Sequence, residues 1–149
     1  MKWLLIARKS GQEIYELRNA EEKLLSVTIQ QRSGSLRITT NDEKRVFLVR
    51  KQGFLRSRTV LQNEYGIRIG QLSYDNTFTT GIIEFDNEKF NYSLQNGLLR
   101  ELTIKRNEEI IANCELPAVS DNNFHNDLLV LALGWYLISF VNKQVEEYA

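Results

Sequence analysis

The sequence predicts a mainly β protein: a closed antiparallel barrel of about 10–12 strands that encloses a hydrophobic C-terminal helix. Apolar and polar residues alternate with a period of two from Trp3 to Leu116, which is typical of half-buried strands. Turn-forming residues interrupt this alternation about every ten residues. The segment from Leu128 to Val141 then carries no charge and places apolar side chains at every angle around a helix, so it must be surrounded on all sides.

The strands are short, and their alternation is clearest in the segments where large apolar residues share one side. Polar residues occupy the other side, so we expect one face of the sheet to be buried and the other to be in water. The apolar sets are Leu25, Val27 and Ile29; Phe90, Tyr92 and Leu94; Leu102 and Ile104; and Ile110, Ala112, Cys114 and Leu116.

Clusters of turn-forming residues separate the strands. Asn96-Gly97 is the best of them, because this pair is favoured in two-residue hairpin turns whose central residues need positive φ. It predicts that residues 89–95 and 98–106 pair. Within residues 67–74 the apolar phase changes across Gly70, which predicts a β-bulge. The other predicted turns are Ser33-Gly34, Asn41 to Glu43, Asn63 to Gly66, Asp75-Asn76, Asp86-Asn87 and Asn107-Glu108.

The uncharged C-terminal segment is too short for a membrane span. A spanning helix needs about 20 apolar residues, whereas runs of about 10–14 are typical of buried core helices. The segment would form a helix about 21 Å long, close to the height of a tilted barrel of seven- or eight-residue strands. We predict one domain over residues 1–149, with strands in 1–117, a loop in 118–126 and a central helix in 127–145. Asn126 or Asp127 is expected to cap that helix.

The composition limits location and partners. Lys plus Arg and Asp plus Glu number 19 each, so the overall charge favours neither a general nucleic-acid binder nor an acidic tail. A single cysteine excludes an internal disulfide and suits a reducing compartment. The apolar block Trp3–Ala7 is shorter than a signal-peptide core of about 7–15 residues. We therefore expect a cytoplasmic protein.

Side chains that usually build catalytic or metal sites are scarce. His125 is the only histidine, and we expect it in a polar loop with no other metal ligands at suitable spacing. Cys114 shares the phase of Ile110 and Ala112, which favours a small core residue over a nucleophile. The sequence contains no phosphate loop, dinucleotide fingerprint or serine-nucleophile elbow. We predict a protein that is not an enzyme and uses no metal and no cofactor.

The one charge feature above background is the segment from Lys44 to Arg58, which contains basic residues and no acidic residue. Each basic side chain near an anionic bilayer contributes about 1 kcal/mol, and an aromatic tip between the charges could insert among lipids. The alternative is a solvated barrel wall, because exposed strands often carry Lys and Arg for solubility. Nucleic acid is less favoured, because stacking aromatics are not aligned with the charges. The candidate ligand-binding residues are Arg50, Lys51, Phe54, Arg56 and Arg58.

The last strands and the helix also carry a family resemblance. The matching segments are Phe90-Asn91-Tyr92-Ser93-Leu94, Gly97, Leu102-Thr103-Ile104, Ile111-Ala112 and Asp127 to Leu133. Over about the last 60 residues, this pattern resembles LURP-one-related proteins and phospholipid scramblases of the tubby-like superfamily. The resemblance implies a barrel around a core helix, and it implies phosphoinositides or other anionic lipid headgroups as ligands.

Two functional hypotheses follow. The first is a non-enzymatic module that binds anionic lipid headgroups, at the periphery of a membrane, or binds a protein partner. The second is a carrier barrel for a small apolar ligand, like a lipocalin, with the C-terminal helix packed outside the wall. An outer helix should keep a polar face, which residues 128–141 lack, so the pattern favours the first. Lipid movement of the scramblase kind rests on the resemblance alone, since the helix is a poor membrane span.

Overall fold

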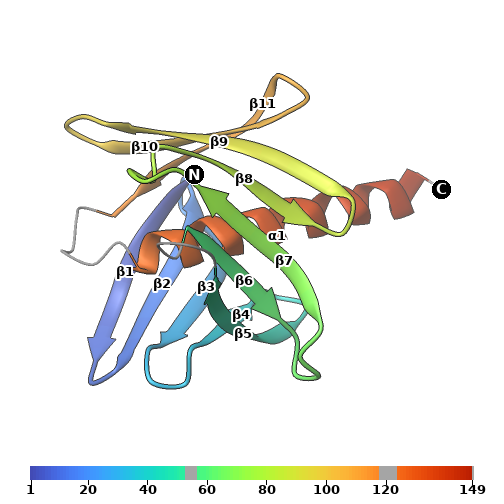
Figure 1. Ribbon diagram of the computed structural model, residues 1–149. Coiled ribbons are helices and arrows are strands. Elements are labelled where there is room, and N and C mark those ends of the chain that lie inside the picture. Colours follow the sequence, from blue (N-terminus) through green and yellow to red (C-terminus); the bar gives the residue numbers. More distant parts are fainter. Residues whose placement is uncertain (53–56, 118–123, 149) are drawn as a thin grey trace.

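The computed structural model describes residues 1–52, 57–117 and 124–148; for residues 124, 125 and 140–148 it describes the backbone alone. The described chain forms a closed β-barrel around one C-terminal helix (Figure 1). The strands are β1 (Lys2–Lys9), β2 (Gln12–Asn19), β3 (Glu22–Gln30), β4 (Ser35–Thr39), β5 (Lys44–Gln52), β6 (Arg58–Gln62), β7 (Arg68–Tyr74), β8 (Thr80–Phe85), β9 (Glu88–Asn96), β10 (Arg100–Arg106) and β11 (Glu109–Leu116), and the helix is α1 (Phe124–Tyr148).

Each strand pairs with the next one along the chain in antiparallel orientation, and β1 pairs with β11 to close the barrel. The closing pair is parallel. This follows from the number of strands, because eleven strands of alternating direction bring the first and the last together with the same direction. At this seam Lys2 lies opposite Glu115, and the Glu115 amide donates to the Met1 carbonyl oxygen at 3.0 Å. The predicted barrel of about 10–12 strands is confirmed, with a parallel seam.

The helix occupies the inside of the barrel, as predicted. Residues 128–133 are six consecutive helical positions, and each is at most 1% exposed. A one-sided layer of strands could not cover all of them, because successive helical residues point in every direction. Inward side chains of the strands form one core with them, including Leu36, Phe47, Leu72 and Leu102. Figure 1 shows α1 passing through the barrel, with its C-terminal end emerging from one mouth.

The helix starts earlier and ends later than predicted, at Phe124 and Tyr148 instead of 127 and 145. Neither Asn126 nor Asp127 is therefore the residue before the first helical turn. Asp127 nevertheless lies within that turn, and its carboxylate accepts a hydrogen bond from the Leu128 amide at 3.1 Å. The negative charge is favourable there, since the amide groups of a first helical turn point toward it.

Glycines allow the helix and two strands to pack closely. A Cβ atom on Gly134 would lie 2.7 Å from the Ile83 Cγ2 atom, so the helix could not approach β8 this closely with a larger residue. A Cβ atom on Gly70 would lie 2.3 Å from the Phe85 ring. Gly70 also adjoins the predicted bulge, because the register between β6 and β7 shifts from Leu61 opposite Gly70 to Gln62 opposite Arg68. The bulge prediction is confirmed.

Two local predictions were wrong. Asn96 pairs with Arg100, so residues 97–99 form the loop between β9 and β10, and neither Asn96 nor Gly97 has a positive φ. The strands still pair as expected, but not through a two-residue turn. Ile110 is 54% exposed although Ala112 is buried. The register between β10 and β11 shifts there, and the extra residue moves Ile110 to the outer face.

The enclosed helix makes the core sensitive to truncation of its side chains. Leu131→Ala should lower the free energy of unfolding by about 2–5 kcal/mol, because the Leu131 side chain is fully buried and its loss leaves a cavity. Urea denaturation followed by circular dichroism measures this change. Leu98→Ala is the matched control: Leu98 is fully exposed, so the substitution should change stability by less than about 0.5 kcal/mol. Equal effects of the two substitutions would contradict the enclosed helix.

Candidate functional site

Strands β4 to β7 carry seven basic residues and no acidic residue. Strand alternation sorts these residues between the two faces of the barrel. Arg45 and Lys51 share the inward phase of Phe47, whereas the others have the outward phase. The outward basic residues, called the basic wall below, are Arg37, Lys44, Arg50, Arg58 and Arg68.

The strand register brings these side chains into neighbouring positions. Arg50 lies opposite Val60, which makes Arg58 its diagonal neighbour across the strand pair, at about 7–8 Å between backbones. Gln62 lies directly opposite Arg68 on the other side. The Arg50 Nε donates a hydrogen bond to the Gln62 Oε1 at 3.0 Å, so Gln62 bridges the space between Arg50 and Arg68. The basic wall is therefore continuous across β5, β6 and β7.

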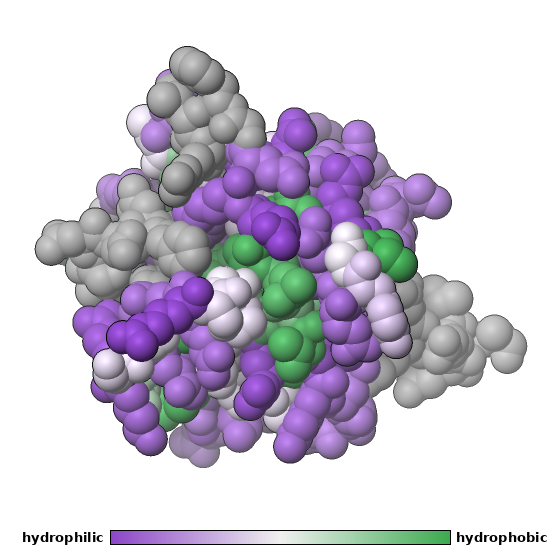
Figure 2. Space-filling model, turned by 60° about the horizontal axis from the view of Figure 1, so that its bottom comes forward, coloured by the Kyte–Doolittle hydropathy of each residue, from purple (hydrophilic) through white to green (hydrophobic). Residues whose placement is uncertain are grey.

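Apolar side chains lie between the charges on β5. Val46 is 48% exposed and sits opposite Arg37, and Leu48 is half-buried opposite Gln62. Strands β4 and β5 are on the lower side of the barrel in Figure 1, which Figure 2 turns toward the viewer. Figure 2 shows hydrophobic side chains gathered near the centre of that side and surrounded by hydrophilic ones.

The charges of the basic wall are not neutralised by acidic neighbours among the described residues. No ion pair within the described ranges involves any of the five side chains. The nearest acidic residues are Asp42 and Glu43 in the turn before β5, Glu64 in the turn after β6, and Glu84 of β8, which lies opposite Gln71 of β7. Glu43 pairs with Arg45, which is not part of the basic wall. Arg50 and Arg58 are exposed to solvent. Unpaired exposed guanidinium groups keep their full capacity to bind phosphate or carboxylate oxygens.

Only some of the candidate ligand-binding residues selected from the sequence lie on the basic wall. Arg50 and Arg58 lie together on the basic wall. Phe54 and Arg56 lie outside the described residues. Arg37 and Arg68 were missed, because they come from outside the segment from Lys44 to Arg58. The pairing of β4 with β5 and of β6 with β7 brings them to the same face, and a search for outward-phase charges on adjacent predicted hairpins would have found them.

Lys51 points into the barrel. Its Nζ atom lies 3.4 Å from the Asp127 Oδ2 atom, and Asp127 is 1% exposed. The Thr59 hydroxyl donates to the same carboxylate oxygen at 2.5 Å. Burial raises the pKa of the Asp127 carboxyl above its usual value, whereas the Lys51 ammonium and the Thr59 hydroxyl oppose this shift. Lys51 therefore anchors the helix to the wall instead of facing a ligand outside.

A second polar contact holds the same helical turn from the opposite side of the barrel. With its amide oriented by its hydrogen-bonding partners, Asn126 accepts bonds from both terminal nitrogens of Arg100 at 3.1 Å. Arg100 comes from β10, whereas Lys51 comes from β5. The start of the enclosed helix is thus fixed between two walls.

The remaining reactive groups do not assemble into a site. Burial raises the pKa of the Cys114 thiol to about 12, which keeps it protonated and unreactive at neutral pH. His125 lies in the first turn of α1 and not in the loop that the sequence suggested. Among the described residues, no group of three or more His, Cys, Asp or Glu side chains is placed to hold a metal ion. Within the same residues, no helix has the length and apolar character needed to cross a membrane.

We compared the chain with protein-family models, characterised proteins and solved structures, and none of them matches. Its functional assignment therefore rests on its own residues.

The buried Asp127 should leave a signature in the pH dependence of stability. Because burial raises the pKa of the Asp127 carboxyl in the folded state above its ordinary value of 3.8, its contribution to stability is present below that value and is lost as pH rises through the folded pKa. The wild type should therefore lose stability relative to Asp127→Asn as the pH is raised from about 3. Urea denaturation of both proteins across this range measures the difference. Asp86→Asn, at an exposed turn, is the matched control, and parallel curves for wild type and Asp127→Asn would contradict the assignment.

Proposed function

We propose that this chain is a non-enzymatic binding module whose basic wall contacts the phosphate groups of anionic lipid headgroups. The observation that carries the proposal is the set of five outward basic residues on four consecutive strands that contain no acidic residue. Four of the five are arginines, whose planar guanidinium groups can bind two phosphate oxygens at once. The outer surface of a barrel is convex, so it suits many shallow contacts with a membrane surface better than one deep pocket.

The expected strength is that of a reversible peripheral contact. At about 1 kcal/mol for each basic residue near an anionic bilayer, five residues contribute roughly 5 kcal/mol, which corresponds to a dissociation constant somewhat below 1 mM. Insertion of Val46 between headgroups would add a small apolar contribution. Because the attraction is mainly electrostatic and exposed, it should weaken strongly as the salt concentration rises.

The competing functions have less support. A carrier barrel needs an empty lumen, and here residues 128–133 fill the barrel while the helix lies inside the wall. Nucleic acid needs aromatic side chains for base stacking, and the outward positions of β4 to β7 carry none. An acidic protein partner would use the same guanidinium chemistry, so it is the outcome that the experiment must separate from a lipid surface. The resemblance to the tubby-like superfamily is the reason to include phosphoinositides among the lipids tested.

The test is flotation of the protein with neutral, phosphatidylserine-containing and phosphoinositide-containing vesicles at low and high salt. The wild type should float with anionic vesicles only, and about 0.5 M NaCl should release it. Arg50→Glu/Arg58→Glu should reduce the bound fraction at least tenfold, because it reverses two adjacent charges of the basic wall.

The matched control is Lys89→Glu/Lys105→Glu, which reverses two exposed charges on β9 and β10. It makes the same change in net charge away from the basic wall, so it should float nearly as well as the wild type. Equal losses in the two variants would show a response to net charge alone. A wild type that does not float with any vesicle would overturn the lipid proposal and direct the search to acidic protein partners.

A further inference from the structure

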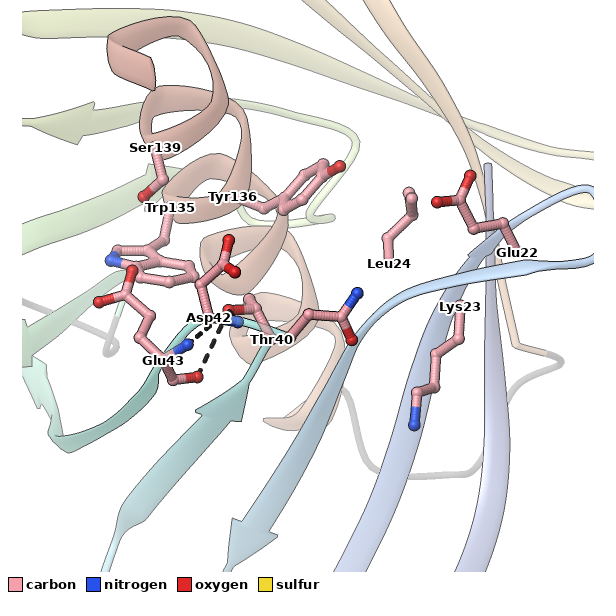
Figure 3. A pocket seen from close by; sticks show the side chains of 10 residues that line it. Glu22, Lys23, Leu24, Thr40, Asp42, Glu43, Trp135, Tyr136 and Ser139 are labelled. Atoms are coloured by element: carbon pink, nitrogen blue, oxygen red, sulfur yellow. Dashed lines mark hydrogen bonds between the residues drawn. The ribbon is translucent and has the colours of Figure 1, made fainter. Parts of the chain in front are cut away.

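A second surface feature lies at the barrel mouth from which α1 emerges. A partly enclosed pocket of about 250 Å³ is formed there by the start of β3, the turn between β4 and β5, and one side of the helix (Figure 3). None of its lining residues belongs to the basic wall, although Glu43 directly precedes Lys44. Its volume is below the range of about 300–1,000 Å³ typical of drug-sized ligands, so it suits a small ion or a single chemical group.

The pocket combines carboxylates with aromatic rings. Carboxylates come from Glu22 at the start of β3 and from Asp42 and Glu43 in the turn between β4 and β5, and aromatic rings come from Trp135 and Tyr136 of the helix. Lys23 also lines the pocket, but Figure 3 shows its amine directed away from the two rings. A cation is attracted both by the carboxylates and by the negative faces of aromatic rings. This combination disfavours anions and purely apolar molecules.

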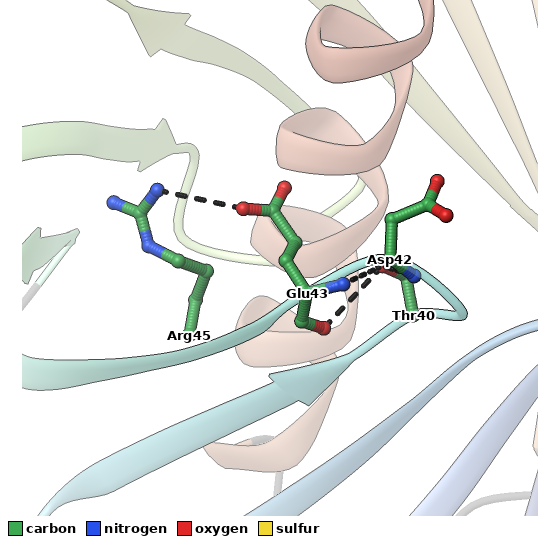
Figure 4. A network of polar contacts seen from close by, with 4 residues as sticks. All are labelled: Thr40, Asp42, Glu43 and Arg45. Atoms are coloured by element: carbon green, nitrogen blue, oxygen red, sulfur yellow. Dashed lines mark hydrogen bonds and ion pairs between the residues drawn. The ribbon is translucent and has the colours of Figure 1, made fainter.

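At the same mouth, the cationic side chain of Arg45 already contacts both an aromatic ring and a carboxylate. The Arg45 guanidinium carbon lies 5.5 Å from the centre of the Phe47 ring. The Arg45 Nη1 atom is 3.9 Å from the Glu43 carboxylate, and Figure 4 shows this ion pair beside the helix. The Phe47 ring packs edge-on against Trp135, at 6.2 Å between ring centres. The local field at this mouth therefore stabilises a positive charge placed between a carboxylate and an aromatic ring.

Two further features hold the pocket in one shape before a ligand binds. The turn between β4 and β5 is fixed by Thr40, whose hydroxyl oxygen accepts hydrogen bonds from the Asp42 and Glu43 amides at 3.3 and 3.1 Å. A preformed turn does not have to be ordered when a ligand binds. The Trp135 side chain is 8% exposed and packs edge-on against Phe47, so its ring is also held in place before a ligand binds.

We propose that this pocket binds a small organic ammonium ion of the choline type, which carries a methylated ammonium group. The methyl groups would lie against Trp135, Tyr136 and Leu24, and the positive charge would face Asp42 and Glu22. This inference is independent of the proposed lipid contact, because it uses different residues, a different surface and the opposite charge.

The experiment is a calorimetric titration of the full chain with choline chloride, with sodium chloride at the same ionic strength in every cell. Saturable binding of one choline per chain is expected. The neutral isostere 3,3-dimethyl-1-butanol has the same shape without the charge, so it should bind at least about tenfold more weakly. Equal binding of choline and its isostere would overturn the proposal, as would the absence of saturable choline binding.

Glu22→Gln/Asp42→Asn removes two carboxylates of the pocket with little change in shape and should weaken choline binding about tenfold. The matched control is Glu101→Gln/Glu109→Gln, which removes two exposed carboxylates from β10 and β11 and should leave the affinity unchanged. Unfolding curves of both variants verify that they are folded. Equal affinities of the two folded variants would exclude this pocket as the binding site.

Discussion

The uncharged helix is the constraint on which the rest of the structure depends. Its central turns have no polar side, so they are stable in water only when strands cover them from every direction. A barrel wide enough to do so needs about eleven strands, and an odd number of sequential antiparallel strands can close only through a parallel seam. Gly134 and Gly70 then remove the atoms that would keep the helix and strands apart. The strand count, the seam and these glycines are consequences of one apolar segment.

Filling the lumen with the helix also decides where function can lie. Two polar side chains of the helix lie inside the barrel: Asp127 contacts Lys51 and Asn126 contacts Arg100, which fixes the first turn of the helix between opposite walls. Such buried contacts fix one position of the helix along the barrel axis, since sliding it would leave a buried charge without its partner. The interior of the barrel is therefore filled by packed side chains of the strands and the helix. The outer wall and the mouth carry the chemistry that is available to other molecules.

The sequence predicted the fold because its evidence is periodic and local. The alternation of polar and apolar residues predicted the strands, and the absence of a polar side in the C-terminal segment predicted the enclosed helix. The sequence was less informative about the basic wall, because the residues of that wall come from four different strands. Lys51 was grouped with Arg50 by its place in a basic run, yet adjacent residues in a strand point to opposite faces. Arg37 and Arg68 join Arg50 only through the register of neighbouring strands. The pocket is formed by three segments that are far apart in the sequence, so no single stretch of sequence predicts it.

The two proposed surfaces are linked by their opposite charges. The chain has as many acidic as basic residues, so the excess of positive charge on the basic wall is balanced elsewhere, in part by Glu22, Asp42 and Glu43 at the mouth. Asp42 and Glu43 directly precede Lys44, the first residue of the basic wall on β5. Near an anionic surface, this arrangement attracts the wall and repels the rim of the mouth. The protein would therefore lie with its β4 to β7 wall against the headgroups, and the pocket at the mouth would stay open to solution.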